Sequence, residues 1–165
     1  MSRLDSAIRR LSAQRDCLAH AAALIGAAPG VVLEIGLGNG RTYDHMRWLM
    51  PGRDIYVFER QVEAHPDCIP DPDHLILGDF RETMPGLAAT LGAKAVLAHC
   101  DVGNGDHPGN ARLAVALAPL LVPLLAPGAI VASDQPLHHP ALVEAPLPAT
   151  VRPGRYSLYR LETPR

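Results

Sequence analysis

Short apolar segments and helical segments alternate along most of the chain, and this alternation limits the fold more than any other feature of the sequence. Helical stretches lie at 42–50 and 81–91, and an Ala/Leu-rich stretch follows residue 109. Apolar runs without a period-2 pattern are typical of parallel strands that are buried on both faces. We therefore predict a doubly wound α/β fold, with a mostly parallel sheet and helices on both faces. The five predicted parallel strands are residues 31–35, 55–58, 75–77, 95–98 and 129–132.

The two ends of the chain depart from this alternation. Residues 142–151 and 156–161 are apolar segments joined by Arg152-Pro153-Gly154, which is typical of a hairpin. Residues 4–25 have the spacing of an amphipathic helix that ends near Gly26. The predicted buried stripe of this helix consists of Leu4, Ile8, Leu11, Leu18 and Ile25.

Prolines limit two of the predicted helical segments. Residues 64–73 contain three prolines, so this segment can hold at most one helical turn. Pro85 lies within the predicted helix 81–91, and we expect it in the first turn, where a missing N–H costs no helical hydrogen bond.

The composition excludes several classes of protein. The chain has 165 residues and a formal net charge of −2, which suit one domain with one core. Its fifteen Lys and Arg residues are scattered, so we expect no nucleic-acid partner. The N-terminus lacks the apolar core of a signal peptide, and the longest apolar stretch, 111–126, is interrupted by Arg112, Pro119 and Pro123. The three separated cysteines fit reduced thiols, and we expect a soluble cytoplasmic protein with no membrane partner.

Glycines occupy every second position directly after strand 31–35, at Gly36, Gly38 and Gly40. Positions without a side chain let the backbone approach a ligand closely. Backbone amides at the start of the following helix favour a negatively charged group. The turn therefore predicts a nucleotide-like ligand at this edge of the sheet.

Carboxylates follow the next two predicted strands. Glu59 ends the strand 55–58, and Asp79 follows the strand 75–77. In an open α/β sheet, ligands bind at the edge where the parallel strands have their carboxyl ends. Glu59 can accept hydrogen bonds from both hydroxyls of a ribose, and Asp79 can accept one from an adenine amino group. These residues predict an adenosine-type ligand.

The spacing of the glycines separates two kinds of adenosine ligand. Proteins that bind nicotinamide dinucleotides normally carry the spacing GxGxxG. Here the third glycine comes one position early, at Gly40, and Arg41 occupies the expected site. A NAD-dependent oxidoreductase therefore stays an alternative, and a non-catalytic module that binds an adenosine cofactor is another.

The run from Val31 to Gly40 resembles motif I of the class I S-adenosylmethionine-dependent methyltransferases. In that family an acidic residue two positions before the first glycine lies near the amino group of the methionine moiety, and Glu34 holds this position. The run from Gly36 to His45 is also similar to a group of small bacterial methyltransferases with no assigned acceptor. The resemblance covers roughly residues 30–135.

The resemblance implies S-adenosyl-L-methionine as cofactor and a Rossmann-like sheet of seven strands whose last strand is antiparallel. Glu59 would be the ribose-binding acid and Asp79 the adenine-side acid. We expect one methyltransferase domain at 29–165, with 1–28 as an amphipathic helix that covers the active-site side. The implied cofactor-binding residues are Glu34, Gly36, Leu37, Gly38, Asn39, Gly40, Glu59, Arg60, Asp79, Phe80 and His99.

His99 and Asp101 follow the strand 95–98, at the edge where the cofactor is expected. Methyl transfer from a sulfonium is an in-line displacement, so a base is needed only if the acceptor must lose a proton. We predict His99 as the candidate catalytic base and Asp101 as the candidate group that orients it. The structural alternative for His99 is a side chain that caps the strand and bonds to backbone.

Asp134-Gln135, after the strand 129–132, is similar to the Asp-Asn pair of the cation-dependent O-methyltransferases. In that family the other carboxylate comes from the loop that holds Asp101 here, and a divalent ion would acidify a hydroxyl acceptor. Gln135 in place of Asn and His99 in place of an acid depart from that pattern. We therefore predict no metal and keep Asp101, Asp134 and Gln135 as the alternative metal site.

Together these features predict a methyltransferase that acts on a small-molecule acceptor. The short chain leaves only the N-terminal helix and the loops after strands 95–98 and 129–132 to cover an acceptor. The second subunit of a homodimer would also complete such a pocket.

Overall fold

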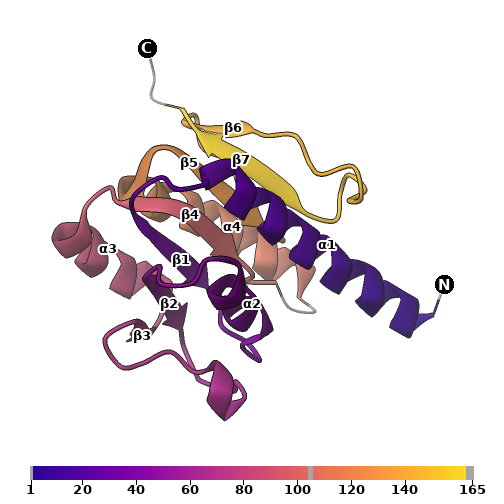
Figure 1. Ribbon diagram of the computed structural model, residues 1–165, viewed down its shortest axis with the longest axis horizontal. Helices are drawn as coiled ribbons and strands as arrows, with labels where there is room; N and C mark the ends of the chain where they lie inside the picture. The colour runs from indigo at the N-terminus through magenta and orange to yellow at the C-terminus, as the bar shows by residue number, and fades with distance from the viewer. Residues whose placement is uncertain (1, 104–105, 163–165) are drawn as a thin grey trace.

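The computed structural model describes residues 2–103 and 106–162, which form one sheet flanked by helices (Figure 1). The strands are β1 Val31–Ile35, β2 Ile55–Glu59, β3 Leu75–Leu77, β4 Ala95–Cys100, β5 Leu125–Ser133, β6 Leu142–Glu144 and β7 Ser157–Leu161. The helices are α1 Arg3–Ile25, α2 Arg41–Leu49, α3 Phe80–Leu91 and α4 His107–Leu121, with 3-10 turns η1 Pro66–Cys68 and η2 Val122–Leu124.

The seven strands lie in the order β3-β2-β1-β4-β5-β7-β6. Strands β1 to β5 pair in parallel, and β7 pairs antiparallel with both β5 and β6. The predicted fold, a mostly parallel seven-stranded sheet with an antiparallel last strand, is confirmed. Because β1 and β4 are neighbours although they are far apart in sequence, the chain reverses its winding between them, and ligands bind at such a switch point.

Each face of the sheet has its own layer of helices. On one face, Cys17 and Leu18 of α1 and Met46 of α2 pack with strand residues such as Val32. On the other face, Met84 of α3 belongs to the same core as residues of α4 and β1. Residues on alternate sides of β1 therefore enter different cores, which explains why its sequence is apolar at successive positions.

The N-terminal helix buries a different stripe from the one that its spacing predicts. Leu18 and Ile25 are buried as predicted, whereas Leu4 and Ile8 are 69% and 53% exposed. The N-terminal end of α1 projects beyond the sheet (Figure 1), so those two side chains have nothing to pack against. The side chains that α1 buries are Ala13, Gln14, Cys17, Leu18, Ala21 and Ile25.

The predicted C-terminal hairpin is present, but its first strand is short. Strand β6 ends at Glu144, and residues 145–156 join it to β7 instead of the tight turn that was expected at 152–154. Pro146 and Pro148 follow β6, and proline cannot donate a hydrogen bond to a neighbouring strand. The expectation for Pro85 is also wrong, because α3 begins at Phe80 and Pro85 lies in its second turn.

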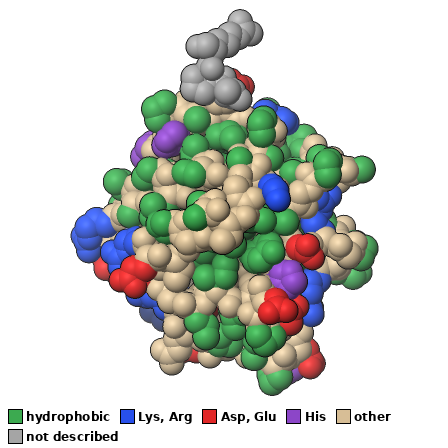
Figure 2. All heavy atoms as spheres, turned by 90° about the vertical axis from the view of Figure 1, so that its left-hand side faces the viewer, with side chains coloured by type: hydrophobic (Ala, Val, Ile, Leu, Met, Phe, Trp, Pro, Cys, Tyr) green, Lys and Arg blue, Asp and Glu red, His purple; other side chains and the backbone are tan. Residues whose placement is uncertain are grey.

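The charged side chains are mixed on the surface. On the face shown in Figure 2, the Lys and Arg side chains do not form a continuous stripe, and acidic, histidine and apolar side chains lie between them. Among the described residues, no helix combines the length and the apolar character needed to cross a membrane.

The correction to α1 is testable with two substitutions on the same helix. Leu18→Ala should lower the free energy of unfolding by about 2–4 kcal/mol, because it leaves a cavity in the core. Leu4→Ala should change it by less than about 0.5 kcal/mol, because this side chain is exposed. Urea denaturation of both variants checks this, and equal losses would show that the predicted stripe is the buried one.

Candidate functional site

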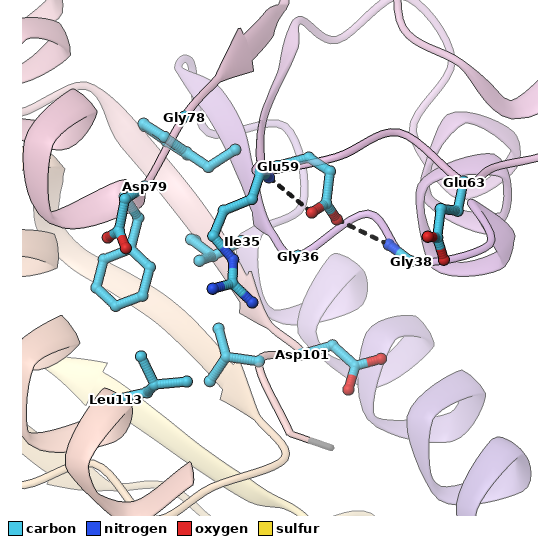
Figure 3. Close-up of a pocket in the computed structure, with 13 residues that line it drawn as sticks. Ile35, Gly36, Gly38, Glu59, Glu63, Gly78, Asp79, Asp101 and Leu113 are labelled. Atoms are coloured by element: carbon cyan, nitrogen blue, oxygen red, sulfur yellow. Dashed lines mark hydrogen bonds between the residues drawn. The ribbon is translucent and has the colours of Figure 1, made fainter. Parts of the chain in front are cut away.

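A cleft of about 360 Å³ opens at the carboxyl ends of β1 to β4 (Figure 3). It includes six of the predicted cofactor residues, and Asp101 forms one of its walls. The sequence did not single out Glu63, Val102 or Leu113, which the fold brings to the same cleft. The lining residues are Ile35, Gly36, Gly38, Phe58, Glu59, Arg60, Glu63, Gly78, Asp79, Phe80, Asp101, Val102 and Leu113.

The three glycines after β1 have different physical roles. At Gly36, with φ of 93°, a Cβ atom would lie 2.3 Å from the carbonyl oxygen of Asp101. At Gly40, with φ of 81°, a Cβ atom would lie 2.4 Å from the Cβ of Cys68. Gly38 also has a positive φ, but no atom lies within 4 Å of the position that its Cβ would take. Gly36 and Gly40 therefore allow the chain to pack, and Gly38 keeps the surface of the cleft open.

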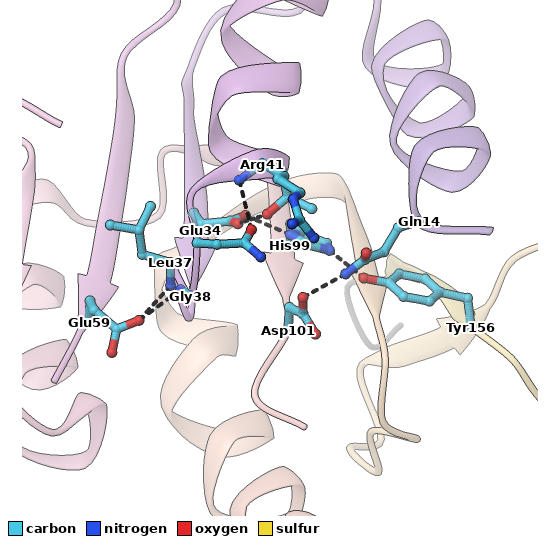
Figure 4. A network of polar contacts seen from close by, with 11 residues as sticks. Gln14, Glu34, Leu37, Gly38, Arg41, Glu59, His99, Asp101 and Tyr156 are labelled. Carbon is cyan, nitrogen blue, oxygen red and sulfur yellow. Dashed lines mark hydrogen bonds and ion pairs between the residues drawn. The ribbon is translucent and has the colours of Figure 1, made fainter. Parts of the chain in front are cut away.

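The carboxylate of Glu59 holds the glycine-rich turn in place. Its Oε2 accepts hydrogen bonds from the amides of Leu37 and Gly38, at 2.8 and 3.1 Å (Figure 4). Its Oε1 accepts one from Arg60 N at 2.7 Å (Figure 3). A protein carboxylate therefore already occupies these two amides, and a ligand phosphate could bind them only by displacing Glu59. The expectation that amides at the start of the following helix favour a negatively charged group concerns α2, which begins at Arg41, and stays a prediction.

Asp79 is the N-cap of α3 and faces the cleft beside Phe80. Its Oδ1 accepts hydrogen bonds from Arg81 N at 2.9 Å and from Arg81 Nε at 2.8 Å. These bonds and the guanidinium charge lower the pKa of Asp79 to about 2, so the carboxylate stays ionised and accepts hydrogen bonds only. An ionised carboxylate next to an apolar ring is chemically suited to the amino edge of an adenine, and this role stays a prediction.

Three other predicted cofactor residues do not line the cleft. Leu37 and Gly40 are buried, and Asn39 is exposed with its Oδ1 accepting a hydrogen bond from Arg41 N at 3.3 Å. Leu37 contributes its backbone amide to Glu59. These residues shape the turn, and contact between their side chains and the cofactor stays a prediction.

Glu34 and His99 form a fully buried pair between β1 and β4. They are register partners in the parallel ladder, and His99 Nδ1 lies 2.6 Å from Glu34 Oε2 (Figure 4). Glu34 Oε1 accepts a hydrogen bond from Thr42 Oγ1 at 2.5 Å. On its other side, His99 Nε2 is hydrogen-bonded to the hydroxyl of Tyr156. Both side chains lie behind the glycine-rich turn, outside the cleft.

The charge of Glu34 determines the protonation of His99. Burial alone would lower the pKa of His99, but the charge and hydrogen bond of Glu34 outweigh it, and the pKa is raised. In the protonated ring both nitrogens donate hydrogen bonds, one to Glu34 and one to Tyr156. To act as a base, His99 would first have to lose the proton that Glu34 stabilises. A proton taken from the methyl acceptor would then have to reach the ring through the hydroxyl of Tyr156. Both this role and the contact of Glu34 with a ligand amino group stay predictions.

A second cavity of about 670 Å³ adjoins the cleft and shares Gly38 and Asp101 with it. Asp101 Oδ2 accepts a hydrogen bond from Gln14 Nε2 at 2.6 Å, which ties α1 to the loop after β4 (Figure 4). Burial raises the pKa of Asp101 and of Asp134. The residues that line this cavity are Arg10, Gln14, Gly38, Asp101, Gly103, Asn110, Asp134, Gln135, Pro136, Gly154, Arg155 and Tyr156.

The fold brings the alternative metal residues Asp101, Asp134 and Gln135 to this second cavity. Two of their contacts are already made within the protein. Gln135 Nε2 donates to Asp134 Oδ2 at 2.9 Å, and Gln14 donates to Asp101. Within residues 2–103 and 106–162, no group of three or more His, Cys, Asp or Glu side chains has the arrangement of a metal site. Asp101, Asp134 and Gln135 stay an alternative metal site.

Tyr156 and Gln14 are functional candidates that sequence reasoning missed. Tyr156 comes just before β7, and Gln14 lies on α1, so both are distant in sequence from the glycine-rich turn. For Gln14, the sequence signal was a polar residue on an otherwise apolar helix face. Such a side chain needs a polar partner when it is buried, as Gln14 is.

Comparison with known proteins identifies the family of the chain. Residues 1–161 match the family model described as S-adenosyl-L-methionine methyltransferase, and the chain belongs to this family. It is an S-adenosylmethionine-dependent methyltransferase. The S-adenosyl-L-methionine methyl transferase of Silicibacter pomeroyi DSS-3 is 46% identical, with a TM-score of 0.93 over 98% of this chain and 99% of that one.

More distant structures share the fold. The 1,6-didemethyltoxoflavin-N1-methyltransferase of Burkholderia thailandensis, solved with 1,6-didemethyltoxoflavin and S-adenosylhomocysteine, is 17% identical with a TM-score of 0.60. That similarity covers 92% of this chain and 79% of the other. The putative methyltransferase yhhF of Escherichia coli is 13% identical with the same TM-score of 0.60, covering 92% and 87%. The search of curated proteins gives no match.

The different roles of the glycines predict different effects of the same substitution. Strain at a positive φ costs about 1–3 kcal/mol, and in Gly36→Ala a collision of the new Cβ with backbone adds to this cost. Gly36→Ala should therefore lower the free energy of unfolding by more than the strain alone. Gly38→Ala should cost only about 1 kcal/mol and weaken the binding of S-adenosylhomocysteine, because its methyl group would enter the cleft. Urea denaturation and calorimetry measure the two effects. The assignment fails if Gly38→Ala binds normally.

The buried pair predicts how stability depends on pH. The raised pKa of folded His99 gives stability that is fully present below the unfolded pKa of about 6.5 and is lost as the pH rises toward the folded pKa. Glu34→Gln keeps the shape but removes the charge that raises this pKa. The free energy of unfolding of the wild type should therefore fall above about pH 6.5 relative to that of Glu34→Gln. Parallel curves between pH 6 and 9 would contradict the charged state of the pair.

Proposed function

We propose that the protein transfers the methyl group of S-adenosylmethionine, bound in the first cleft, to a small-molecule acceptor bound in the second cavity. The observation that carries this proposal is that the two cavities meet at Gly38 and Asp101. In-line displacement needs the acceptor atom and the methyl carbon in contact, which two adjoining cavities can provide.

The residues of the first cleft fit an adenosine-type cofactor. Glu59, held by the loop amides, presents carboxylate lone pairs near the end of β2 and would accept the ribose hydroxyls. Asp79 and Phe80 would hold the adenine. The cofactor supplies an electrophilic methyl group on a sulfonium, and this arrangement would direct it toward Gly38 and Asp101.

The chain's own residues would then position the acceptor. Asp101 is fixed by Gln14, and Tyr156 is fixed by His99, which is itself fixed by Glu34. This chain of hydrogen bonds links α1, β1, β4 and the segment before β7. Pre-organised polar groups of this kind avoid the cost of reorganising solvent during the reaction. Glu34 and His99 thus act as positioning residues behind the site.

The size of the second cavity supports a small acceptor. Its volume of about 670 Å³ lies within the range of small-molecule sites, and α1 borders it through Arg10 and Gln14. We also infer a cytoplasmic location, because Cys17, Cys68 and Cys100 are free thiols. A homodimer that completes the cavity stays a prediction, and ultracentrifugation would test it.

Calorimetry with S-adenosylhomocysteine tests the assignment of the first cleft. Glu59→Ala should weaken binding by roughly 1.5–3 kcal/mol, which is about 10- to 150-fold, because it removes charge-assisted hydrogen bonds. The control Glu144→Ala changes an exposed glutamate on β6 and should bind as the wild type does. Equal affinity of Glu59→Ala and wild type would show that Glu59 does not bind the ribose.

A further inference from the structure

Polar side chains are concentrated around the second cavity. The polar or charged side chains that are buried among the described residues are Gln14, Glu34, His99, Asn110 and Ser133. Gln14 and Asn110 line this cavity, Ser133 directly precedes the lining residue Asp134, and the Glu34–His99 pair joins it through Tyr156. Buried polar groups cost free energy unless they are satisfied. Each of these groups already has a partner within the protein, so together they give the cavity fixed polar surroundings.

The charges on the cavity wall are separated into two regions. Asp101 and Asp134 are partly buried, whereas Arg10 and Arg155 are exposed. The acidic side chains therefore lie at the inner end and the arginines at the mouth. Neither arginine forms an ion pair with any carboxylate among residues 2–103 and 106–162. An acceptor with a positive or N–H-bearing end and an anionic end would match both regions.

Asp134 has hydrogen-bonding capacity that the protein leaves unused. Gln135 Nε2 and the backbone amides of Val102 and Gly103 donate to this carboxylate. Its Oδ1 is buried and has no donor within the part of the chain that the structure describes. An ionised carboxylate accepts several hydrogen bonds, and a buried one without a donor is costly. A ligand that donates hydrogen bonds would supply the missing partner once the atoms that cover Oδ1 move aside.

Building on the proposed function, we propose that the acceptor is a small amine that also carries an anionic group. Its nitrogen would lie beside Asp134, and its carboxylate or phosphate would lie between Arg10 and Arg155. An amine offers two or three N–H donors to the acidic end, whereas a hydroxyl offers one. A carboxylate as the methylated group would be repelled by Asp101 and Asp134.

The chemical balance of the transfer is simple. An ammonium acceptor first gives one proton to solvent, which restores the lone pair of its nitrogen. That lone pair forms the new bond to the methyl carbon while the carbon–sulfur bond breaks and its electron pair stays on sulfur. The products are S-adenosylhomocysteine and a methylated nitrogen that carries one positive charge. That charge is formed beside Asp134, where a carboxylate stabilises it.

Asp101 and Asp134 have separable roles in this arrangement. Asp101 lines both cavities, so it would also face the methionine end of a cofactor bound in the first cleft. Asp134 lines only the second cavity. A substitution at Asp134 should therefore affect the acceptor and leave the cofactor unaffected, whereas one at Asp101 should affect both.

A panel of matched compounds tests the acceptor class. The panel contains aliphatic and aromatic amino carboxylates, the corresponding hydroxy carboxylates and the corresponding amines without a carboxylate. Formation of S-adenosylhomocysteine and of methylated product is measured for each. Amino carboxylates should be methylated, and the hydroxy analogues should not react. The amines without a carboxylate should have kcat/KM values that are lower by about tenfold or more. The proposal is overturned if hydroxy carboxylates are preferred, or if no amine reacts although S-adenosylhomocysteine binds.

Variants distinguish this proposal from the proposed function itself. Asp134→Asn should lower kcat/KM for the reactive amine by about tenfold or more and leave the affinity for S-adenosylhomocysteine within about twofold. Arg155→Ala should raise KM with little change in kcat. If Asp134→Asn weakens S-adenosylmethionine binding but not S-adenosylhomocysteine binding, Asp134 serves the sulfonium, and the amine proposal is wrong. If wild type binds neither cofactor form, the proposed function fails instead.

Discussion

The buried pair of Glu34 and His99 is the interaction on which both cavities depend. It joins β1 to β4 at the point where the chain reverses its winding, and neither side chain has any exposed surface. A charged group that loses its partner in such a place costs several kcal/mol. The pair also extends outward, through Thr42 to α2 and through Tyr156 to the C-terminal hairpin. The first turn of α2 and the wall of the second cavity are therefore fixed to the same two strands.

A second constraint acts on the glycine-rich turn from its other side. Glu59 binds the amides of Leu37 and Gly38, while Gly36 allows the turn to pass within contact of the Asp101 carbonyl. The turn is thus fixed to both β2 and β4. A loop held in this way has its shape before any ligand arrives, which reduces the entropy cost of binding.

Most of the fold could be predicted from the sequence because it depends on local patterns. Strands β1 and β3 have the predicted bounds, and the prolines of 64–73 leave only the single turn η1. The error in α1 has a tertiary cause. Leu4 and Ile8 have helical spacing, but the sheet does not extend far enough to cover them. At the site, the glycine-rich turn, Glu59 and Asp79 could be predicted because they lie at or just after the ends of strands. Gln14 and Tyr156 could not, because they reach the second cavity only through the packing of α1 and the hairpin.

The central claim is that methyl donor and acceptor meet where the two cavities join. A crystal structure of the protein with S-adenosylhomocysteine tests it most directly, since anomalous scattering locates the cofactor sulfur. We predict the adenosine between Glu59 and Phe80, and the sulfur beside Gly38 and Asp101 with its open side toward Asp134. Adenosine in the second cavity, or a sulfur separated from that cavity by protein atoms, would contradict the account.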